Sequence, residues 1–152
     1  ISEMVRRIVL GFEKQLTDKE IDLTLDIPDK LEISADHDAI FQVVYNLTDN
    51  AVKFTDQTGK IIIYLSAKGG KMQMNIVNTG PGIGPEAIDH IFERFYRVDK
   101  ARSRKYGGAG LGLALCMEIA HAHAATLEIE SEVGRGTVIR LRFDGKGKGS
   151  VL

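Results

Sequence analysis

The sequence predicts one α+β domain that combines amphipathic helices with β-hairpins. Apolar residues recur at three- and four-residue steps in residues 2–16 and 36–54, which is the period of a helix with one buried face. Apolar and polar residues alternate in two pairs of strands, each pair joined by a short turn that contains glycine. These four strands are expected at 60–67, 71–78, 126–131 and 137–143. A chain of 152 residues can bury a core of this kind without disulfides.

Composition excludes several classes of protein. The chain has 20 lysines and arginines against 21 acidic residues, so bulk charge gives no reason to expect binding to nucleic acid or to an acidic membrane. No apolar run approaches the roughly 20 residues that span a bilayer, and no signal peptide opens the chain. The single cysteine, Cys116, excludes an intrachain disulfide framework and fits a reducing compartment. Because it lies in an apolar helical run, we expect a core residue rather than a nucleophile. A start at Ile1, without methionine, suggests a fragment of a longer protein.

The first half of the chain alternates between the two kinds of element. We expect a helix over residues 2–16, followed by a half-buried strand over residues 21–27 that ends at Pro28. A short strand over residues 31–34 follows. Asp36 is a good helix cap, and an apolar stripe continues from it to Phe54, so the second long helix is expected there.

This second helix carries three polar residues on one face. Asn46, Asn50 and Lys53 follow each other at steps of four and three. Asparagine is a poor helix former, so two of them on one face need a reason. One interpretation is a solvated face with incidental polar residues. The other is a row of carbonyl oxygens and an ammonium aimed at one ligand, such as Mg²⁺ with phosphate. The spacing alone leaves both open.

The middle of the chain is rich in glycine and then in aromatic residues. Residues 78–85 read N-T-G-P-G-I-G-P, and these glycines leave the backbone open to close approach. Pro85 suits the first turn of a short helix through Phe92, and the aromatic residues of 92–97 suggest an anchor on the core. Residues 98–106 are polar and basic, which indicates either a solvated loop or a lid over phosphates.

A second glycine-rich stretch opens directly into a helix. Residues 107–115 read G-G-A-G-L-G-L-A-L, and the apolar helical run continues to about Ala124. Backbone N–H groups at a helix start are unpaired and carry partial positive charge, and glycine lets an anion approach them. By itself the stretch is a weak signal that favours an ordinary turn over a phosphate site, because glycine clusters also form turns. We expect residues 144–152 to form a flexible tail.

The order and spacing of five motifs resemble a known family. They are N-L-T-D-N-A-V-K-F-T at 46–55, N-T-G-P-G-I-G at 78–84, F-E-R-F-Y-R at 92–97, G-A-G-L-G-L at 108–113 and G-R-G-T at 134–137. This pattern is similar to the catalytic ATP-binding domain of sensor histidine kinases. That domain belongs to a superfamily shared with gyrase, the Hsp90 chaperone and MutL, known as the GHKL or Bergerat-fold ATPases.

The resemblance covers residues 1–143 and implies a fold. The family folds as a two-layer α/β sandwich in which about three helices pack on one face of a mixed, mostly antiparallel sheet. ATP binds between helices and a mobile lid, which here corresponds to residues 97–109. The cofactors implied are ATP and Mg²⁺.

The resemblance also implies roles for individual residues. Asn50 is expected to bind Mg²⁺, with Asn46 helping to hold the phosphates or the metal. Lys53 and Arg97 correspond to cations that contact the phosphate chain, and these two with Asn46 are the expected catalytic residues. The remaining nucleotide-binding positions are Phe54, Asn78, Gly80, Gly82, Ile83 and Gly84 around the adenine, Gly108, Gly110, Leu111 and Gly112 at the phosphates, and Thr137 near the base.

Two features depart from the family pattern. Most of the superfamily has aspartate at the position of Asn78, whose carbonyl can accept the same adenine amino proton as a weaker, neutral acceptor. The family's phosphoacceptor histidine lies on a helical hairpin ahead of this domain, and none of the four histidines here has the neighbours of that motif. We therefore expect nucleotide binding without a histidine in this chain to phosphorylate.

The leading hypothesis is a kinase domain that transfers the γ-phosphoryl of ATP to a histidine on the dimerisation hairpin of the same full-length kinase. An ATPase clamp like gyrase or Hsp90 is the alternative, but its catalytic glutamate would fall at Asn46, which cannot act as a base. A degenerate nucleotide-binding module is the third. The expected partners are the hairpin and a response-regulator receiver domain, with no nucleic acid. The domain is expected to be monomeric and cytoplasmic, and anchorage of its parent in a bacterial inner membrane is left open.

Overall fold

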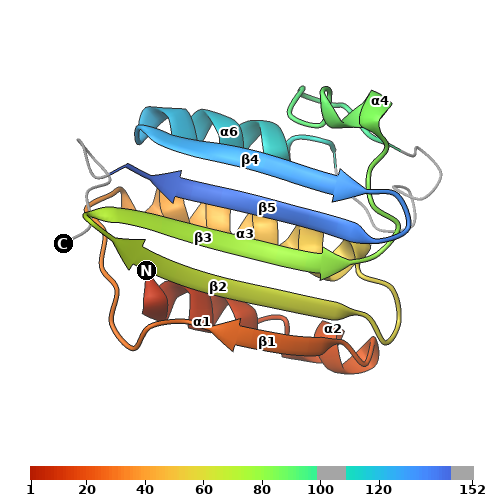
Figure 1. Ribbon diagram of the computed structural model, residues 1–152, viewed down its shortest axis with the longest axis horizontal. Coiled ribbons are helices and arrows are strands. Elements are labelled where there is room, and N and C mark those ends of the chain that lie inside the picture. Colours follow the sequence, from red (N-terminus) through yellow and green to blue (C-terminus); the bar gives the residue numbers. More distant parts are fainter. Residues whose placement is uncertain (99–108, 145–152) are drawn as a thin grey trace.

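The computed structural model of the chain describes residues 1–98 and 109–144. The described residues form a five-stranded sheet with its main helices packed on one face (Figure 1). The elements in order are α1 (Ser2–Leu10), α2 (Glu13–Asp18), β1 (Asp22–Asp26), α3 (His37–Phe54), β2 (Lys60–Lys68), β3 (Lys71–Thr79), α4 (Pro85–Ile88), α6 (Gly112–Ala122), β4 (Ala125–Glu132) and β5 (Gly136–Phe143). This confirms the predicted α+β sandwich.

The sheet is mixed, as expected. Its strand order is β1-β2-β3-β5-β4. Strand β1 pairs in parallel with β2, and the other three pairings are antiparallel. The long helix α3 connects the parallel pair, because parallel neighbours cannot be joined by a tight turn. The two predicted hairpins are β2–β3 and β4–β5.

The core lies between the sheet and helices α1, α3 and α6. Three successive rows of side chains cross β3, β5 and β4 on the face toward the helices. They are Met72–Phe143–Ala125, Met74–Leu141–Leu127 and Ile76–Ile139–Ile129. The next row in the same register is polar and consists of Asn78, Thr137 and Ser131. The apolar floor of the sandwich therefore ends in polar groups at one end of the sheet.

Two of the predicted elements are wrong in extent near the N-terminus. The single helix expected over residues 2–16 is two helices, because α1 ends at Leu10 and α2 begins at Glu13. Gly11 weakens the helix at this point, and Phe12 leaves the helical conformation to enter the core beside Tyr45, with ring centroids 5.3 Å apart. The strand expected over residues 31–34 is reduced to an isolated bridge at Ile33.

The helix expected from Pro85 through Phe92 is also shorter than predicted. Helix α4 ends at Ile88, and turns follow it. Ile91 is buried and Phe92 packs against the core, whereas Phe95 is 71% exposed. The expected aromatic anchor is therefore wrong for Phe95 and holds for Phe92, which reaches the core from irregular backbone rather than from a helix. The described part of the glycine-rich stretch, residues 109–115, opens into α6 as predicted, starting at Gly112. Residues 99–108 of the expected lid and 145–152 of the expected tail lie outside the described residues.

Five chain segments meet at one end of the sandwich. Figure 1 shows the C-terminal end of α3, the end of β3 and the start of β5 on its right-hand side. The end of β4 and the N-terminal end of α6 lie on the same side. The polar row of Asn78, Thr137 and Ser131 belongs to this end, because Asn78 lies next to the last residue of β3 and Thr137 next to the first of β5.

Candidate nucleotide-binding site

Helix α3 presents the predicted polar face. Asp36 caps the helix, its Oδ1 accepting from the backbone N–H of Ala39 at 2.8 Å. Burial of the apolar stripe turns the opposite face outward, so Asn46 and Asn50 are both only partly buried. Nε2 of Gln42 donates to Oδ1 of Asn46 at 3.4 Å, whereas Asn50 makes no side-chain hydrogen bond to another described residue. Asn50 is thus the amide with the more available oxygen.

Lys53 has a partner that the sequence reasoning missed. Its Nζ donates to Oδ2 of Asp49 at 2.5 Å, and both side chains are partly buried. The two residues are one helical turn apart, so their i,i+4 spacing is a signal that could have identified the pair. The ammonium predicted to meet phosphate is therefore paired with a carboxylate from its own helix.

The C-terminal end of α3 is held by a lysine from α2's C-cap. Nζ of Lys19 donates to the carbonyl oxygens of Val52, Lys53 and Thr55, at 2.8, 3.0 and 2.9 Å. These carbonyls are otherwise the unpaired acceptors of a helix end, where a cation is favoured. Lys19 therefore fixes the turn from which Lys53 and Phe54 project. Sequence reasoning missed it, because its partners lie more than 30 residues away.

The start of α6 faces Asn46 across a narrow space. A methyl group built on Gly112 would lie 3.8 Å from Cγ of Asn46. No side chain among the described residues caps this helix start, whose N-cap is Leu111. Gly110 has φ +71°, and the backbone of Phe95 and Tyr96 lies against it, with the Phe95 N–H donating to the Gly110 carbonyl at 2.9 Å. The uncapped start of α6 therefore lies beside Asn46 on the polar face of α3.

Packing between α3 and α6 fixes this arrangement. Cys116 of α6 is fully buried, and its Sγ lies 3.8 Å from the carbonyl oxygen of Val43 on α3. Burial raises the pKa of the Cys116 thiol to about 12, and a hydrogen bond with Asn46 opposes that rise. The thiol is protonated at neutral pH, which confirms the expectation of a core residue.

Asn78 lies at the end of β3 with its side chain almost fully buried. Its Nδ2 donates to the carbonyl oxygen of Thr79 at 3.1 Å. Its Oδ1 accepts no hydrogen bond from another described residue. This oxygen is not fully enclosed, because the described side-chain atoms that are buried without a partner are Thr48 Oγ1 and Asn75 Nδ2. The amide oxygen is therefore available to a ligand.

The glycine loop that follows Asn78 packs against its neighbours at backbone distance. A Cβ on Gly80, where φ is +156°, would lie 2.3 Å from the carbonyl oxygen of Phe54. A Cβ on Gly82, where φ is +67°, would lie 2.1 Å from the carbonyl oxygen of Glu132. The loop thus touches the end of α3 on one side and the β4–β5 turn on the other, and glycine is required for both contacts.

Ser131 ties this loop to β5, and sequence reasoning missed it. The N–H of Ile83 donates to its Oγ at 2.8 Å, and the Oγ donates to the Gly136 carbonyl at 2.6 Å. Oγ1 of Thr137 lies 2.9 Å from the same Oγ. Its position six residues before Thr137, across a turn, is the one sequence signal for this contact.

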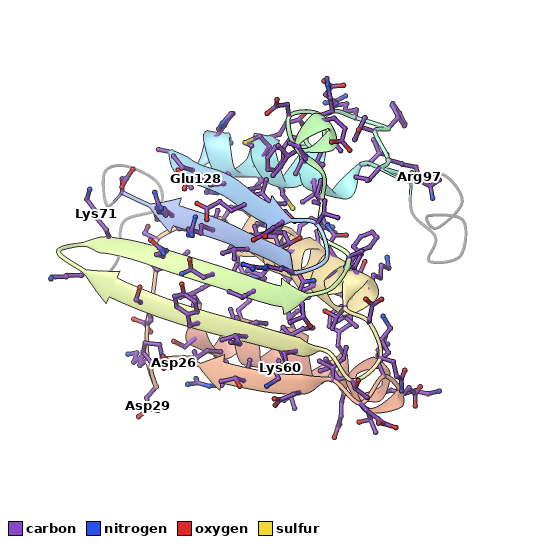
Figure 2. All side chains as sticks on the ribbon, turned by 45° about the vertical axis from the view of Figure 1, so that its right-hand side comes forward. Asp26, Asp29, Lys60, Lys71, Arg97 and Glu128 are labelled. Atoms are coloured by element: carbon purple, nitrogen blue, oxygen red, sulfur yellow. The ribbon has the colours of Figure 1, made fainter. Side chains whose placement is uncertain are left out.

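The other predicted residues are distributed around the same end of the molecule. Phe54 ends α3 and is partly exposed, and Gly84 is the N-cap of α4. Arg97 forms no ion pair with another described residue, and Figure 2 shows it beside the N-terminal end of α6. Gly108 lies outside the described residues.

This donor and acceptor set fits a nucleotide with its metal. Backbone amides and cations suit phosphate, and the free Oδ1 of Asn78 suits the amino group of a base. Among the described residues no group of three or more His, Cys, Asp or Glu side chains could hold a metal ion by itself. Mg²⁺ is usually held by one or two protein oxygens together with water and substrate phosphates, so Asn50 fits that chemistry.

Comparison with known proteins identifies the family. A model of the family described as histidine kinase-, DNA gyrase B- and HSP90-like ATPases matches residues 35–147. The chain belongs to this ATPase family. BaeS of Escherichia coli strain K12, a signal transduction histidine-protein kinase, is 31% identical over 99 residues, covering 65% of this chain and 21% of BaeS. The adaptive-response sensory kinase SasA of Crocosphaera subtropica is 34% identical over 110 residues, covering 70% of this chain and 29% of SasA.

Solved structures agree with this assignment. The catalytic domain of the histidine kinase ThkA has a TM-score of 0.82 and 28% identity, covering 97% of this chain and 92% of that domain. Full-length ShkA in complex with AMPPNP has a TM-score of 0.81 and 27% identity, covering 100% of this chain and 30% of ShkA. ThkA in complex with the response regulator TrrA has a TM-score of 0.76 and 27% identity, covering 94% of this chain and 40% of ThkA. Within the ATPase family, the chain is therefore a sensor histidine kinase ATP-binding catalytic domain.

The chain spans less than a third of the length of these two curated relatives. No described helix of this ATPase domain combines the length and the apolar character that a membrane span needs.

Proposed function

We propose that this domain binds Mg-ATP between the polar face of α3, the glycine loop after β3 and the start of α6. The observation that carries the proposal is the position of Gly112 opposite Asn46. It brings a helix start without a side-chain cap next to an amide side chain of α3. An anion is stabilised there by the partial positive charge of the helix start.

The phosphates would lie between α3 and α6. Lys53 and Arg97 would neutralise the phosphate chain, and Asn46 would hold an oxygen of it beside Gly112. Asn50 would hold Mg²⁺, which supplies charge neutralisation at the β- and γ-phosphates. Phosphoryl transfer depends mainly on positioning and electrostatic stabilisation, so these groups can support it without a covalent intermediate on the protein.

The adenine would lie against the glycine loop and the end of β3. Asn78 Oδ1 would accept a proton of the 6-amino group, and Thr137 lies beside Asn78 in the paired strands. Phe54, at the end of α3, and Ile83, in the glycine loop, would each contact the base. Gly80, Gly82 and Gly84 keep the backbone close enough for this contact, because a side chain at Gly80 or Gly82 would meet a carbonyl oxygen.

Within a longer protein, we propose that the domain transfers the γ-phosphoryl group to a histidine on the dimerisation hairpin. The oxygen–phosphorus bond to ADP breaks and a nitrogen–phosphorus bond to the imidazole forms. The phosphoryl group would then pass to a receiver domain, consistent with the response-regulator complex of ThkA. Such a kinase domain works where ATP is available, so we place it in the cytoplasm.

Isothermal titration calorimetry with Mg-ATP tests the binding step. We expect a dissociation constant in the micromolar-to-millimolar range, that is about −4 to −8 kcal/mol. Lys53→Met should weaken binding, whereas Lys68→Met, the same change at the exposed end of β2, should leave it unchanged. Absence of heat at millimolar Mg-ATP would contradict the proposal.

Labelled ATP and a separately supplied hairpin test the transfer step. Label on the hairpin histidine supports the kinase. Free phosphate without labelled histidine would instead indicate an ATPase clamp, and neither product would indicate a nucleotide-binding module without catalysis. The clamp is disfavoured, because Asn46 stands where a base would have to activate water, and an amide cannot accept that proton.

A further inference from the structure

The hydroxyl of Ser131 has no free hydrogen-bonding capacity. A serine hydroxyl has one hydrogen and two lone pairs. The Gly136 carbonyl oxygen, 2.6 Å away, can only accept, so it takes the hydrogen of Ser131. The N–H of Ile83, 2.8 Å away, can only donate, so it takes one lone pair. One lone pair remains, and it faces Thr137 Oγ1 at 2.9 Å.

This arrangement decides whether the Thr137 hydroxyl donates or accepts in its hydrogen bond with Ser131. Since Ser131 can only accept from it, the Thr137 hydroxyl must donate its single hydrogen to Ser131. Both lone pairs of Thr137 then remain, and its hydroxyl acts only as an acceptor toward any other partner. Thr137 is partly exposed, so a ligand can reach it.

A second acceptor lies next to it. Asn78 and Thr137 are directly paired across β3 and β5, and such neighbours project from the same face with Cβ atoms about 5 Å apart. One of the two hydrogens on Asn78 Nδ2 is donated to the Thr79 carbonyl, and Oδ1 accepts no hydrogen bond from another described residue. This end of the sheet therefore offers a pair of hydrogen-bond acceptors, each fixed by a neighbour.

We propose that Ser131 is a specificity-determining positioning residue, which holds Thr137 as an acceptor so that the site favours a 6-aminopurine over a 6-oxopurine. An exocyclic amino group offers two hydrogens to the two acceptors, either directly or through one water. A 6-oxo group would place a third acceptor against Thr137 Oγ1 and Asn78 Oδ1, so the hydrogen bonds that the amino group makes would be lost. The inference rests on the proposed function, because it takes the base to lie at this end of β3.

A purely structural role for Ser131 has to be distinguished from this one. Its Oγ also tethers the glycine loop through Ile83, and Gly134 N–H donates to the Pro81 carbonyl of the same loop at 2.8 Å. Loss of the tether alone would loosen the loop and lower the affinity for every nucleotide by a similar factor. Loss of the acceptor at Thr137 would change the ratio between amino and oxo purines.

The test measures calorimetric dissociation constants of Mg-ATP and Mg-ITP, which differ in the 6-substituent of the purine. We expect the unmodified domain to prefer ATP by tenfold or more. Ser131→Ala should reduce the ratio of ATP affinity to ITP affinity about tenfold, because the Thr137 hydroxyl is then free to donate to the 6-oxo group. Ser131→Thr keeps the hydroxyl and should retain this ratio of affinities. Ser66→Ala, at an exposed position of β2, is the matched control.

A double substitution shows whether Ser131 acts through Thr137. Thr137→Val removes the hydroxyl with little change in shape, and adding Ser131→Ala to it should leave the ATP/ITP ratio unchanged. The inference is overturned if Ser131→Ala alone leaves the ratio of ATP affinity to ITP affinity unchanged. It is also overturned if Ser131→Ala lowers that ratio as much in the Thr137→Val background as in the unmodified domain. In both cases the proposed function stands. Failure of the unmodified domain to bind ATP would overturn both.

Discussion

Lys53 Nζ lies 2.5 Å from Oδ2 of Asp49, one turn earlier on α3. The pair is partly buried, and it places a carboxylate beside the face proposed to bind phosphates. A negative charge there opposes a polyanion, and it also occupies the lysine expected to meet that anion. Asp49 therefore stands in competition with the nucleotide for Lys53.

Asp49→Asn should accordingly tighten the binding of ATP without magnesium. We expect the dissociation constant in EDTA to fall about three- to tenfold, because the substitution frees Lys53 and removes one repulsive charge. Calorimetry at constant ionic strength measures it. The gain should shrink in a Lys53→Met background. Weaker binding by Asp49→Asn would show that the carboxylate supports the site instead.

Gly112→Ala tests the phosphate position without disturbing the fold. Its new methyl group would lie at an ordinary contact distance of 3.8 Å from Asn46, and Gly112 has no positive φ. The thermal unfolding midpoint should therefore hold, while ATP affinity falls about tenfold because the methyl fills the phosphate space.

Adenosine, which has no phosphates, is the matched probe for Gly112→Ala, and its affinity should not change. Gly11→Ala is the control substitution, since Gly11 has helical φ and belongs to the α1–α2 junction. An equal loss for adenosine and ATP would mean that the phosphates do not lie at the start of α6.

The sequence could predict the parts of this site that are local. Asn46, Asn50 and Lys53 share one face through helical periodicity alone, and glycines mark the two loops. The proton arrangement at Ser131 could not be predicted, because it depends on the register of β4 with β5 and on the docking of the Ile83 loop. The break after Leu10 was missed for a similar reason, since tertiary burial of Phe12 overrides a continuous helical pattern.

Lys19→Met should destabilise the domain by about 1–3 kcal/mol, because three carbonyl oxygens at the end of α3 lose a charged donor. Urea unfolding followed by circular dichroism measures the free energy. Lys14→Met, on exposed α2, is the control and should be neutral. A neutral Lys19→Met would mean that water caps α3 equally well.

Cys116 should resist thiol reagents in the folded state. Burial raises its pKa to about 12, so at pH 8 almost no thiolate is present, and the thiol is covered by α3. We expect modification by a maleimide to follow global unfolding and to become fast in urea. Fast labelling of the folded domain at pH 8 would show that the α3–α6 contact opens readily.

Asn78→Asp combines a gain with a loss. A carboxylate is a stronger acceptor for the adenine amino group, so ATP should bind roughly fivefold more tightly. The same change replaces the donor to the Thr79 carbonyl by an oxygen, in a nearly buried position, which should lower the unfolding free energy by about 1–3 kcal/mol without nucleotide.

Thermal unfolding with and without Mg-ATP, together with calorimetry, separates the two effects of Asn78→Asp. The thermal unfolding midpoint without nucleotide should be lower than that of the unmodified domain. Mg-ATP should raise the midpoint of the variant by more than it raises that of the unmodified domain, because tighter binding stabilises the folded state further. Asn78→Ala loses both groups and should show the destabilisation with weaker binding. If Asn78→Asp binds ATP no better than the unmodified domain, the amide oxygen of Asn78 does not contact the base.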